Sequence, residues 1–176
     1  APARFAALVA LSVPHPSAFL HNLPRQPQQL LRSWYVAFFQ LPAIPERLLR
    51  ARDFALVEAL FRGTTGGLPP YWEALRSTLR ESLPGPLGPY RALRRGLRGP
   101  RRVRVPTLFL TGGKDAAIGP EMAEGQARWI DAPYASAVLE ADHFLHHERA
   151  EEVATRILDF VAATAPALAE GPRQEA

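Results

Sequence analysis

Three short apolar runs predict the buried strands of the chain. They cover Phe5–Val13, Val105–Leu110 and Ala135–Leu139, and turn-forming residues follow each of them. Between the second and third runs, apolar residues recur at helical spacing over Met122–Ile130, which predicts a helix with Pro120 at its first position. Two strands joined by a helix are parallel neighbours in one sheet, so the pattern predicts an α/β fold.

The long segment between the first and second runs has a helical period and no strand pattern. Its longest predicted helix is Gln26–Phe39, and Asp53 is a candidate N-cap for a later one. Shorter helices are expected at 45–51, 53–61, 71–82 and 90–97, with a break at 84–89, and an amphipathic helix at 149–162 follows the third strand. Such a run of helices between two strands is typical of a helical lid inserted into a sheet.

The length of 176 residues fits one domain, or one domain with an insertion. We expect a core strand and turn at 1–16, a helical cap with a return linker at 17–104, a core βαβ unit and helix at 105–163, and a disordered tail at 164–176.

Two side chains that can do chemistry lie just past the ends of predicted strands. Asp115 follows the second strand and His143 follows the third. Parallel neighbouring strands end at the same edge of a sheet, and open α/β sheets place their sites at that edge. An acid that orients a histidine lets the histidine act as a general base. The alternative is that both are ordinary loop residues, and spacing alone leaves both interpretations open.

Composition narrows the class of protein. The formal net charge is +4, and Lys114 is the only lysine, so almost all of the basic charge is arginine. Seven arginines fall within Arg91–Arg104, which suggests either a patch for nucleic acid or another polyanion, or a solvated linker. No aromatic residues are interleaved within the patch, which favours the linker, and we expect no nucleic-acid partner.

Other features exclude several kinds of site. The chain has no cysteine, which rules out disulfides and thiolate chemistry. No apolar run is long enough to cross a membrane and no signal peptide is recognised, so we expect a cytoplasmic location and no membrane partner. His143, His146 and His147 crowd together without a metal-ligand spacing, so no metal and no cofactor are expected. His15 lies between two prolines and is interpreted as a structural turn residue.

Several segments together resemble the C-terminal half of an α/β-hydrolase with a helical cap, and the epoxide hydrolases in particular. The resemblance is specific because the histidine and cap segments occur in one chain. Two positions depart from the family pattern: Asp142 stands where glycine is common, and Pro89 where an aromatic residue is usual. The segments are VALSVPHP (9–16), SWYVAFFQLPAIPE (33–46), PYRAL (89–93), VPTLFLTGGKDAAIGP (105–120) and EADHFLHHERAEEV (140–153).

The resemblance implies a partial α/β-hydrolase fold of three parallel strands with an inserted helical cap. It implies that His143 activates water and that Asp115 is its acid partner. Tyr35 and Tyr90 of the cap would donate hydrogen bonds to the epoxide oxygen as the ring opens, which suits a neutral phenol near pH 7. The substrate of the complete protein would be a small apolar molecule. The reaction would convert an epoxide to a diol through an ester on an aspartate nucleophile.

The nucleophile of that reaction is not recognised in this sequence. No G-x-S-x-G elbow and no His-Gly oxyanion segment occur, and in this fold the nucleophile precedes the acid and the histidine. We therefore expect that an N-terminal half carries the nucleophile and that this chain is inactive alone. The alternatives are a haloalkane dehalogenase or esterase of the same fold, or a non-enzymatic fragment that binds a polyanion.

Overall fold

The computed structural model describes residues 5–65, 67–96 and 102–169. The chain divides into two compact units. We call residues 1–26 with 100–176 the sheet unit, and residues 27–99 the helical unit. No helix within the described residues is both long and apolar enough to cross a membrane.

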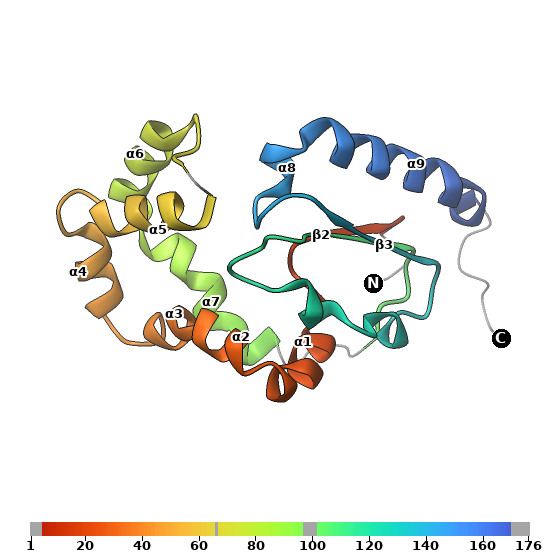
Figure 1. Ribbon diagram of the computed structural model, residues 1–176, viewed down its shortest axis with the longest axis horizontal. Coiled ribbons are helices and arrows are strands. Elements are labelled where there is room, and N and C mark those ends of the chain that lie inside the picture. The colour runs from red at the N-terminus through yellow and green to blue at the C-terminus, as the bar shows by residue number, and fades with distance from the viewer. Residues whose placement is uncertain (1–4, 66, 97–101, 170–176) are drawn as a thin grey trace. The chain divides into compact units, whose positions relative to one another are not determined.

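The sheet unit contains three parallel strands in the order β1-β2-β3 (Figure 1). They are β1 (Leu8–Leu11), β2 (Thr107–Gly112) and β3 (Tyr134–Leu139). The register places Gly112 opposite Leu139, so β2 and β3 end side by side. The three predicted parallel strands are confirmed, although β2 extends two residues past the predicted end at Leu110.

The core of the sheet unit lies between the strands and one long helix. Every residue of β2 is buried, and side chains alternate between the two faces of the sheet. Leu108 and Leu110 pack with Leu139 against α9 (Ala150–Ala169), which contributes Val153 and Phe160. The short helix α8 (Leu145–Glu148) adds the fully buried Leu145 to the same core.

The opposite face of the sheet is covered by short elements, and here one prediction is wrong. Instead of a single helix over Met122–Ile130, the chain forms two 3-10 turns, η3 (Pro120–Ala123) and η4 (Gln126–Trp129). Gly125 separates them with a left-handed φ of 67°, a conformation that a continuing helix does not allow. Pro120 does occupy the first turn, as predicted.

The first helices after β1 belong to the sheet unit rather than to the helical unit. They are α1 (Pro16–Asn22) and the 3-10 turn η2 (Leu23–Arg25). The buried amide of Asn22 donates to the carbonyls of Met122 at 3.2 Å and Glu124 at 3.0 Å, which ties α1 to η3. The boundary with the helical unit therefore lies at 26/27, whereas the sequence analysis places it at 16/17.

The helical unit consists of six helices among its described residues. They are α2 (Pro27–Arg32), α3 (Trp34–Phe38), α4 (Ile44–Arg50), α5 (Ala55–Thr65), α6 (Trp72–Ser82) and α7 (Pro84–Gly96). None of its described residues lies in a strand, as the helical period predicted. Its buried core consists of Leu49, Phe54, Trp72, Leu79, Leu83 and Leu87.

Three local predictions in the helical unit are wrong. The helix expected at Gln26–Phe39 is interrupted at Ser33, whose ψ of 9° leaves the helical region. Asp53 is not an N-cap: it has a left-handed φ of 52°, and its carboxylate accepts two hydrogen bonds from Arg80. The break expected at 84–89 is helical: Pro84 and Pro86 lie in the first turn of α7, where a backbone N–H has no intrahelical partner, and Pro89 lies inside the helix.

The last helix also differs from its prediction. The sequence analysis ends it at Ala162 and expects disorder over 164–176, but α9 continues to Ala169. The added residues include Ala163, Ala165 and Ala167, which favour a helix, and also Pro166, which opposes one. Thr164 is buried and its hydroxyl donates to the carbonyl of Phe160 at 2.8 Å. Residues 170–176 lie outside the described part of the chain.

The N-cap of α1 makes the stability of the sheet unit depend on pH. His15 Nδ1 accepts a hydrogen bond from the Ser17 N–H at 3.1 Å, so this nitrogen carries no proton. Burial lowers the pKa of His15 from its ordinary value of 6.5. The unfolded chain therefore binds a proton more readily than the folded chain, and stability falls as pH drops through 6.5 towards the lower folded pKa.

The variant His15→Asn tests this pH dependence, because asparagine keeps an N-cap acceptor but does not titrate. We expect its free energy of unfolding, measured in urea, to fall less between pH 8 and pH 5 than that of the original chain. An unchanged pH dependence in the variant would contradict the assignment.

Candidate active site

The carboxyl ends of β2 and β3 bring the predicted acid and histidine together. Asp115 lies three residues after Gly112, the last residue of β2, and His143 lies four residues after Leu139, the last residue of β3. Because the strands are parallel and their last residues are paired, both loops leave the same edge of the sheet. The imidazole Nδ1 of His143 lies 2.7 Å from the Asp115 Oδ2 atom.

The Asp115 carboxylate is held on both of its oxygens. Its side chain is fully buried, and Oδ1 accepts hydrogen bonds from the backbone N–H groups of Ala117 and Ile118, each at 2.8 Å. A carboxylate can only accept, so the hydrogen between Oδ2 and His143 belongs to Nδ1. The other ring nitrogen of His143, Nε2, then has a free lone pair and can take a proton from water. The His143 side chain is 25% exposed, so solvent-sized molecules can reach it.

Backbone contacts hold the two loops against each other. The N–H of Gly113 donates to the carbonyl of Leu139 at 2.8 Å, and the N–H of Lys114 donates to the carbonyl of Ala141 at 2.9 Å. These bonds continue the pairing of β2 and β3 into the loops that carry Asp115 and His143. The relative position of the two side chains is therefore set by the sheet.

Gly112 is a site residue that the sequence analysis treated only as part of a turn signal. A Cβ atom at this position would lie 2.3 Å from the carbonyl oxygen of Asp142 and 2.4 Å from that of Ala141. Only glycine lets the histidine loop pass this close to the end of β2. A glycine within a strand pattern is the sequence signal for such a close backbone approach.

Asp142, which departs from the family pattern, stabilises the histidine loop locally. Its carboxylate accepts from the N–H of Phe144 at 3.3 Å, and its own N–H donates to Glu148 Oε1 at 3.2 Å. Burial, with the neighbouring Asp142 carboxyl, raises the pKa of Glu148. The substitution of glycine by aspartate is therefore compatible with an ordered loop.

The two tyrosines predicted from the cap segments contact each other in the helical unit. Tyr35 on α3 and Tyr90 on α7 have ring centroids 5.8 Å apart at an interplanar angle of 81°. Phe39 packs edge-on against both rings. Burial raises the pKa of Tyr90 above its ordinary value of 10.0, which keeps its phenol neutral and able to donate.

An arginine beside Tyr90 fastens α3 to α7. The guanidinium of Arg91 donates to the carbonyls of Phe39 at 3.0 Å and Leu41 at 3.1 Å, and it forms an ion pair with Glu46 at 2.7 Å. The hydrogen bond from Arg91 lowers the pKa of Glu46. Arg91 therefore supports the Tyr35–Tyr90 contact and is not part of a solvated linker.

The remaining histidines show no catalytic or metal-binding arrangement. His15 caps α1 and stacks on Trp129 with ring centroids 5.9 Å apart, in agreement with its structural interpretation. His146 and His147 lie side by side with centroids 4.1 Å apart. Among the described residues, no group of three histidine or acidic side chains could hold a metal ion.

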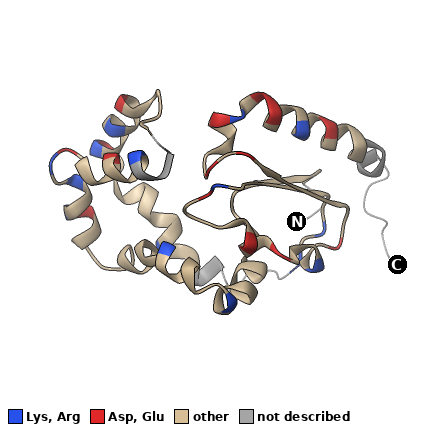
Figure 2. Cartoon of the chain, in the orientation of Figure 1, with Lys and Arg blue, Asp and Glu red and all other residues tan. Residues whose placement is uncertain are grey.

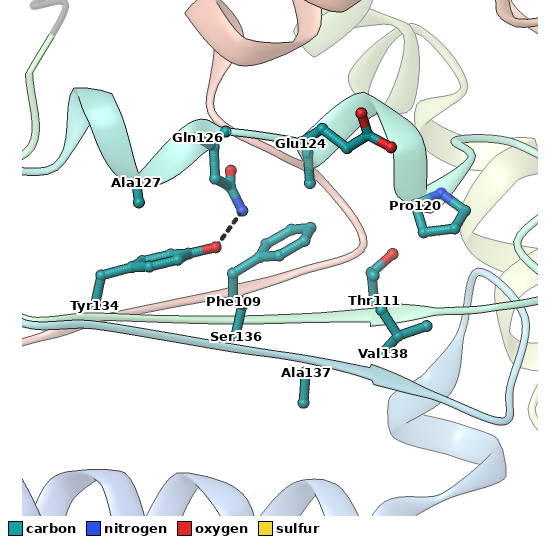
Figure 3. Close-up of a pocket in the computed structure, with 12 residues that line it drawn as sticks. Phe109, Thr111, Pro120, Glu124, Gln126, Ala127, Tyr134, Ser136, Ala137 and Val138 are labelled. Atoms are coloured by element: carbon teal, nitrogen blue, oxygen red, sulfur yellow. Dashed lines mark hydrogen bonds between the residues drawn. The ribbon is translucent and has the colours of Figure 1, made fainter.

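A pocket of about 310 Å³ lies elsewhere in the sheet unit (Figure 3). Its floor is formed by Phe109 and Thr111 of β2 with Tyr134 of β3, and the segment 120–127 covers it. Gln126 Nε2 donates to the Tyr134 hydroxyl at 2.8 Å across this space. Neither Asp115 nor His143 lines the pocket, so it is separate from the acid–histidine pair.

Comparisons with known proteins agree with the resemblance read from the sequence. A sequence model of the alpha/beta hydrolase family matches residues 1–156. The chain is 34% identical to "Epoxide hydrolase 3" of Xenopus tropicalis, over 88% of this chain and 45% of that protein. It is 32% identical to "AB hydrolase superfamily protein YfhM" of Bacillus subtilis (strain 168), over 88% of this chain and 56% of that protein. The chain thus spans about half the length of these curated relatives.

Solved structures show the same fold. The structure of an epoxide hydrolase from Bacillus megaterium superposes with a TM-score of 0.73 at 22% identity, covering 89% of this chain and 61% of that one. Epoxide Hydrolase A from Mycobacterium thermoresistibile gives a TM-score of 0.69 at 21% identity, covering 90% of this chain and 62% of that one.

The close approach at Gly112 leads to a prediction for stability. We expect Gly112→Ala to lower the free energy of unfolding by about 1–3 kcal/mol, because the new methyl group collides with backbone that cannot move independently of the sheet. Amide hydrogen exchange at Gly113 and Lys114 should become faster at the same time. The matched control is Gly67→Ala, between α5 and α6, where a Cβ meets nothing within 4 Å. Equal unfolding curves for the two variants would contradict the account.

Proposed function

The chain belongs to the alpha/beta hydrolase family, as its resemblance predicted, and on that premise we propose that Asp115 and His143 activate water for a hydrolytic reaction. The observation that supports the proposal most is the 2.7 Å contact between His143 Nδ1 and the buried Asp115 carboxylate. This contact leaves Nε2 of His143 as the basic nitrogen. A histidine oriented in this way is the usual general base of acyl transfer.

We propose that the bond cleaved with the help of His143 is an ester formed on a carboxylate nucleophile. His143 Nε2 would remove a proton from water while the water oxygen attacks the ester carbonyl carbon. The C–O bond to the substrate would then break, and the imidazolium would return its proton to the departing alkoxide. Asp115 would stabilise the imidazolium formed between these two proton transfers.

We propose an epoxide as the substrate class, in which case Tyr35 and Tyr90 would assist the first step. Opening the strained ring places negative charge on oxygen, and neutral phenols can donate hydrogen bonds to that oxygen. The contact between the two tyrosine rings and the raised pKa of Tyr90 support this role. The relatives and solved structures named as epoxide hydrolases support the same substrate class. The substrate would be a small apolar epoxide and the product a diol.

We further propose that the nucleophile lies in a part of the complete protein that this sequence does not contain. The printed sequence has no G-x-S-x-G elbow and spans about half the length of its curated relatives. The chain alone would then show no epoxide turnover. A haloalkane dehalogenase or an esterase of the same fold is the alternative activity, and the elbow residue would distinguish an aspartate nucleophile from serine.

The structure offers little to favour a polyanion-binding fragment. Arg91 is engaged by Glu46, and Arg102 forms an ion pair with Asp131, so neither guanidinium is available without breaking a contact. Figure 2 shows acidic and basic residues interspersed along the helices of each unit.

The role of His143 can be tested in a protein that joins this chain to its nucleophile-bearing segment. We expect His143→Gln to lower kcat for an epoxide by about 10²–10⁴-fold, because water is no longer activated. The covalent ester should still form and should accumulate to one equivalent, as measured by mass spectrometry. His21→Gln is the control, since His21 on α1 contacts Trp129 and Arg128 and neither Asp115 nor His143. Full turnover by His143→Gln would refute the proposed function.

The role of the tyrosines can be tested by following ester formation. Tyr35→Phe with Tyr90→Phe should slow formation of the ester from an epoxide by about 10²–10³-fold, since no donor remains for the developing alkoxide. Hydrolysis of a p-nitrophenyl ester by the same protein should change little. Tyr71→Phe, at the start of α6, is the control. Equal rates of ester formation in the double variant and the control would remove the support for an epoxide.

A further inference from the structure

Ser12, the first residue after β1, combines two properties that seldom occur together. It has a left-handed φ of 56°, and it is only 2% exposed. A residue with a Cβ atom adopts this conformation at a cost, and its hydroxyl needs a partner when it is buried. Strained residues persist where their surroundings hold them in place, and such positions often serve a site.

The hydroxyl of Ser12 has its partner in the histidine loop. Its Oγ atom donates to the backbone carbonyl of His143 at 2.7 Å, between residues that are 131 positions apart in the chain. The N–H of Ser12 donates to the carbonyl of Leu110 at 2.8 Å, which continues the pairing of β1 with β2. The bent backbone at Ser12 is thus fixed by β2, and its side chain reaches the loop that follows β3.

His143 is therefore held from two sides by different strands. The loop after β2 provides Asp115, which fixes the imidazole at Nδ1, and the end of β1 provides Ser12, which fixes the backbone carbonyl. If the His143 ring were held only at Nδ1, it could rotate about the hydrogen bond to Asp115 whenever the backbone of His143 moved. With the carbonyl fixed as well, the direction of Nε2 is determined, and catalysis depends steeply on such orientation.

We propose that Ser12 is a positioning residue for His143, and that its hydroxyl sets the direction in which Nε2 takes a proton from water. This inference rests on the proposed role of His143 as the base. Its consequence is specific to one step: loss of the Ser12 hydroxyl slows hydrolysis of the ester, whereas formation of the ester is unaffected.

The first test measures positioning directly in the 176-residue chain. The Nδ1 proton of His143 is observed by NMR in ¹⁵N-labelled protein, and its exchange with water is measured for Ser12→Ala and Ser12→Gly. We expect exchange to become about fivefold to tenfold faster in both variants, the factor that corresponds to the loss of one hydrogen bond. Ser136→Ala, which removes a hydroxyl from an exposed position on β3, should match the original chain.

Ser12→Ala and Ser12→Gly together separate the effect of the hydroxyl on exchange from the effect of the backbone strain. Ser12→Gly removes the hydroxyl and relieves the left-handed strain at φ 56°, so it also folds if Ser12→Ala does not. Original exchange rates in Ser12→Gly would overturn the proposal, because the ring would then be held equally well without the Ser12 hydroxyl. Equal acceleration in Ser136→Ala would overturn it as well.

The second test separates this inference from the proposed function. In the nucleophile-bearing protein, Ser12→Ala should lower the single-turnover rate of ester hydrolysis about fivefold to tenfold and leave the rate of ester formation unchanged. Full activity of His143→Gln would refute the proposed function, while the exchange measurement would still decide whether Ser12 positions the ring. Normal ester hydrolysis in Ser12→Ala, with His143→Gln inactive, would refute the role of Ser12 alone.

Discussion

The buried carboxylate of Asp115 is the constraint around which the sheet unit is arranged. An ionised group removed from water is costly unless each oxygen has hydrogen-bond donors, and Asp115 has three: two backbone N–H groups and the His143 ring. The backbone donors come from its own loop, but the ring comes from the loop after the neighbouring strand. The carboxylate is therefore satisfied only when β2 and β3 pair in their observed register, so the sheet and the acid–histidine pair depend on the same strand pairing.

The two units carry different residues of the proposed site. The sheet unit holds the acid–histidine pair through backbone contacts at Gly112, Gly113 and Lys114. The helical unit holds two phenols in contact through aromatic packing and the guanidinium of Arg91. Both sets of contacts are complete within their own unit.

The sequence predicted the parts of the site that depend on strand ends and missed those that depend on close contacts. Asp115 and His143 could be placed because apolar runs locate β2 and β3, and parallel strands end at one edge. The contact of Tyr35 with Tyr90 was accessible only through the family resemblance, since an aromatic-rich helix gives no local sign of it. Gly112 and Ser12 were missed because their importance comes from backbone that returns from a distant part of the chain. The prediction of a helix at 122–130 is wrong because the spacing of apolar residues does not reveal the left-handed conformation of Gly125.

The most direct measurement is the protonation pattern of the His143 ring in the ¹⁵N-labelled chain at neutral pH. We expect a hydrogen on Nδ1 that is shared with the Asp115 carboxylate and gives a strongly deshielded proton signal. In Asp115→Ala, the deshielded signal should disappear. A ring with its hydrogen on Nε2, or a spectrum that is the same in Asp115→Ala, would contradict the claim that the buried carboxylate prepares His143 to act as a base.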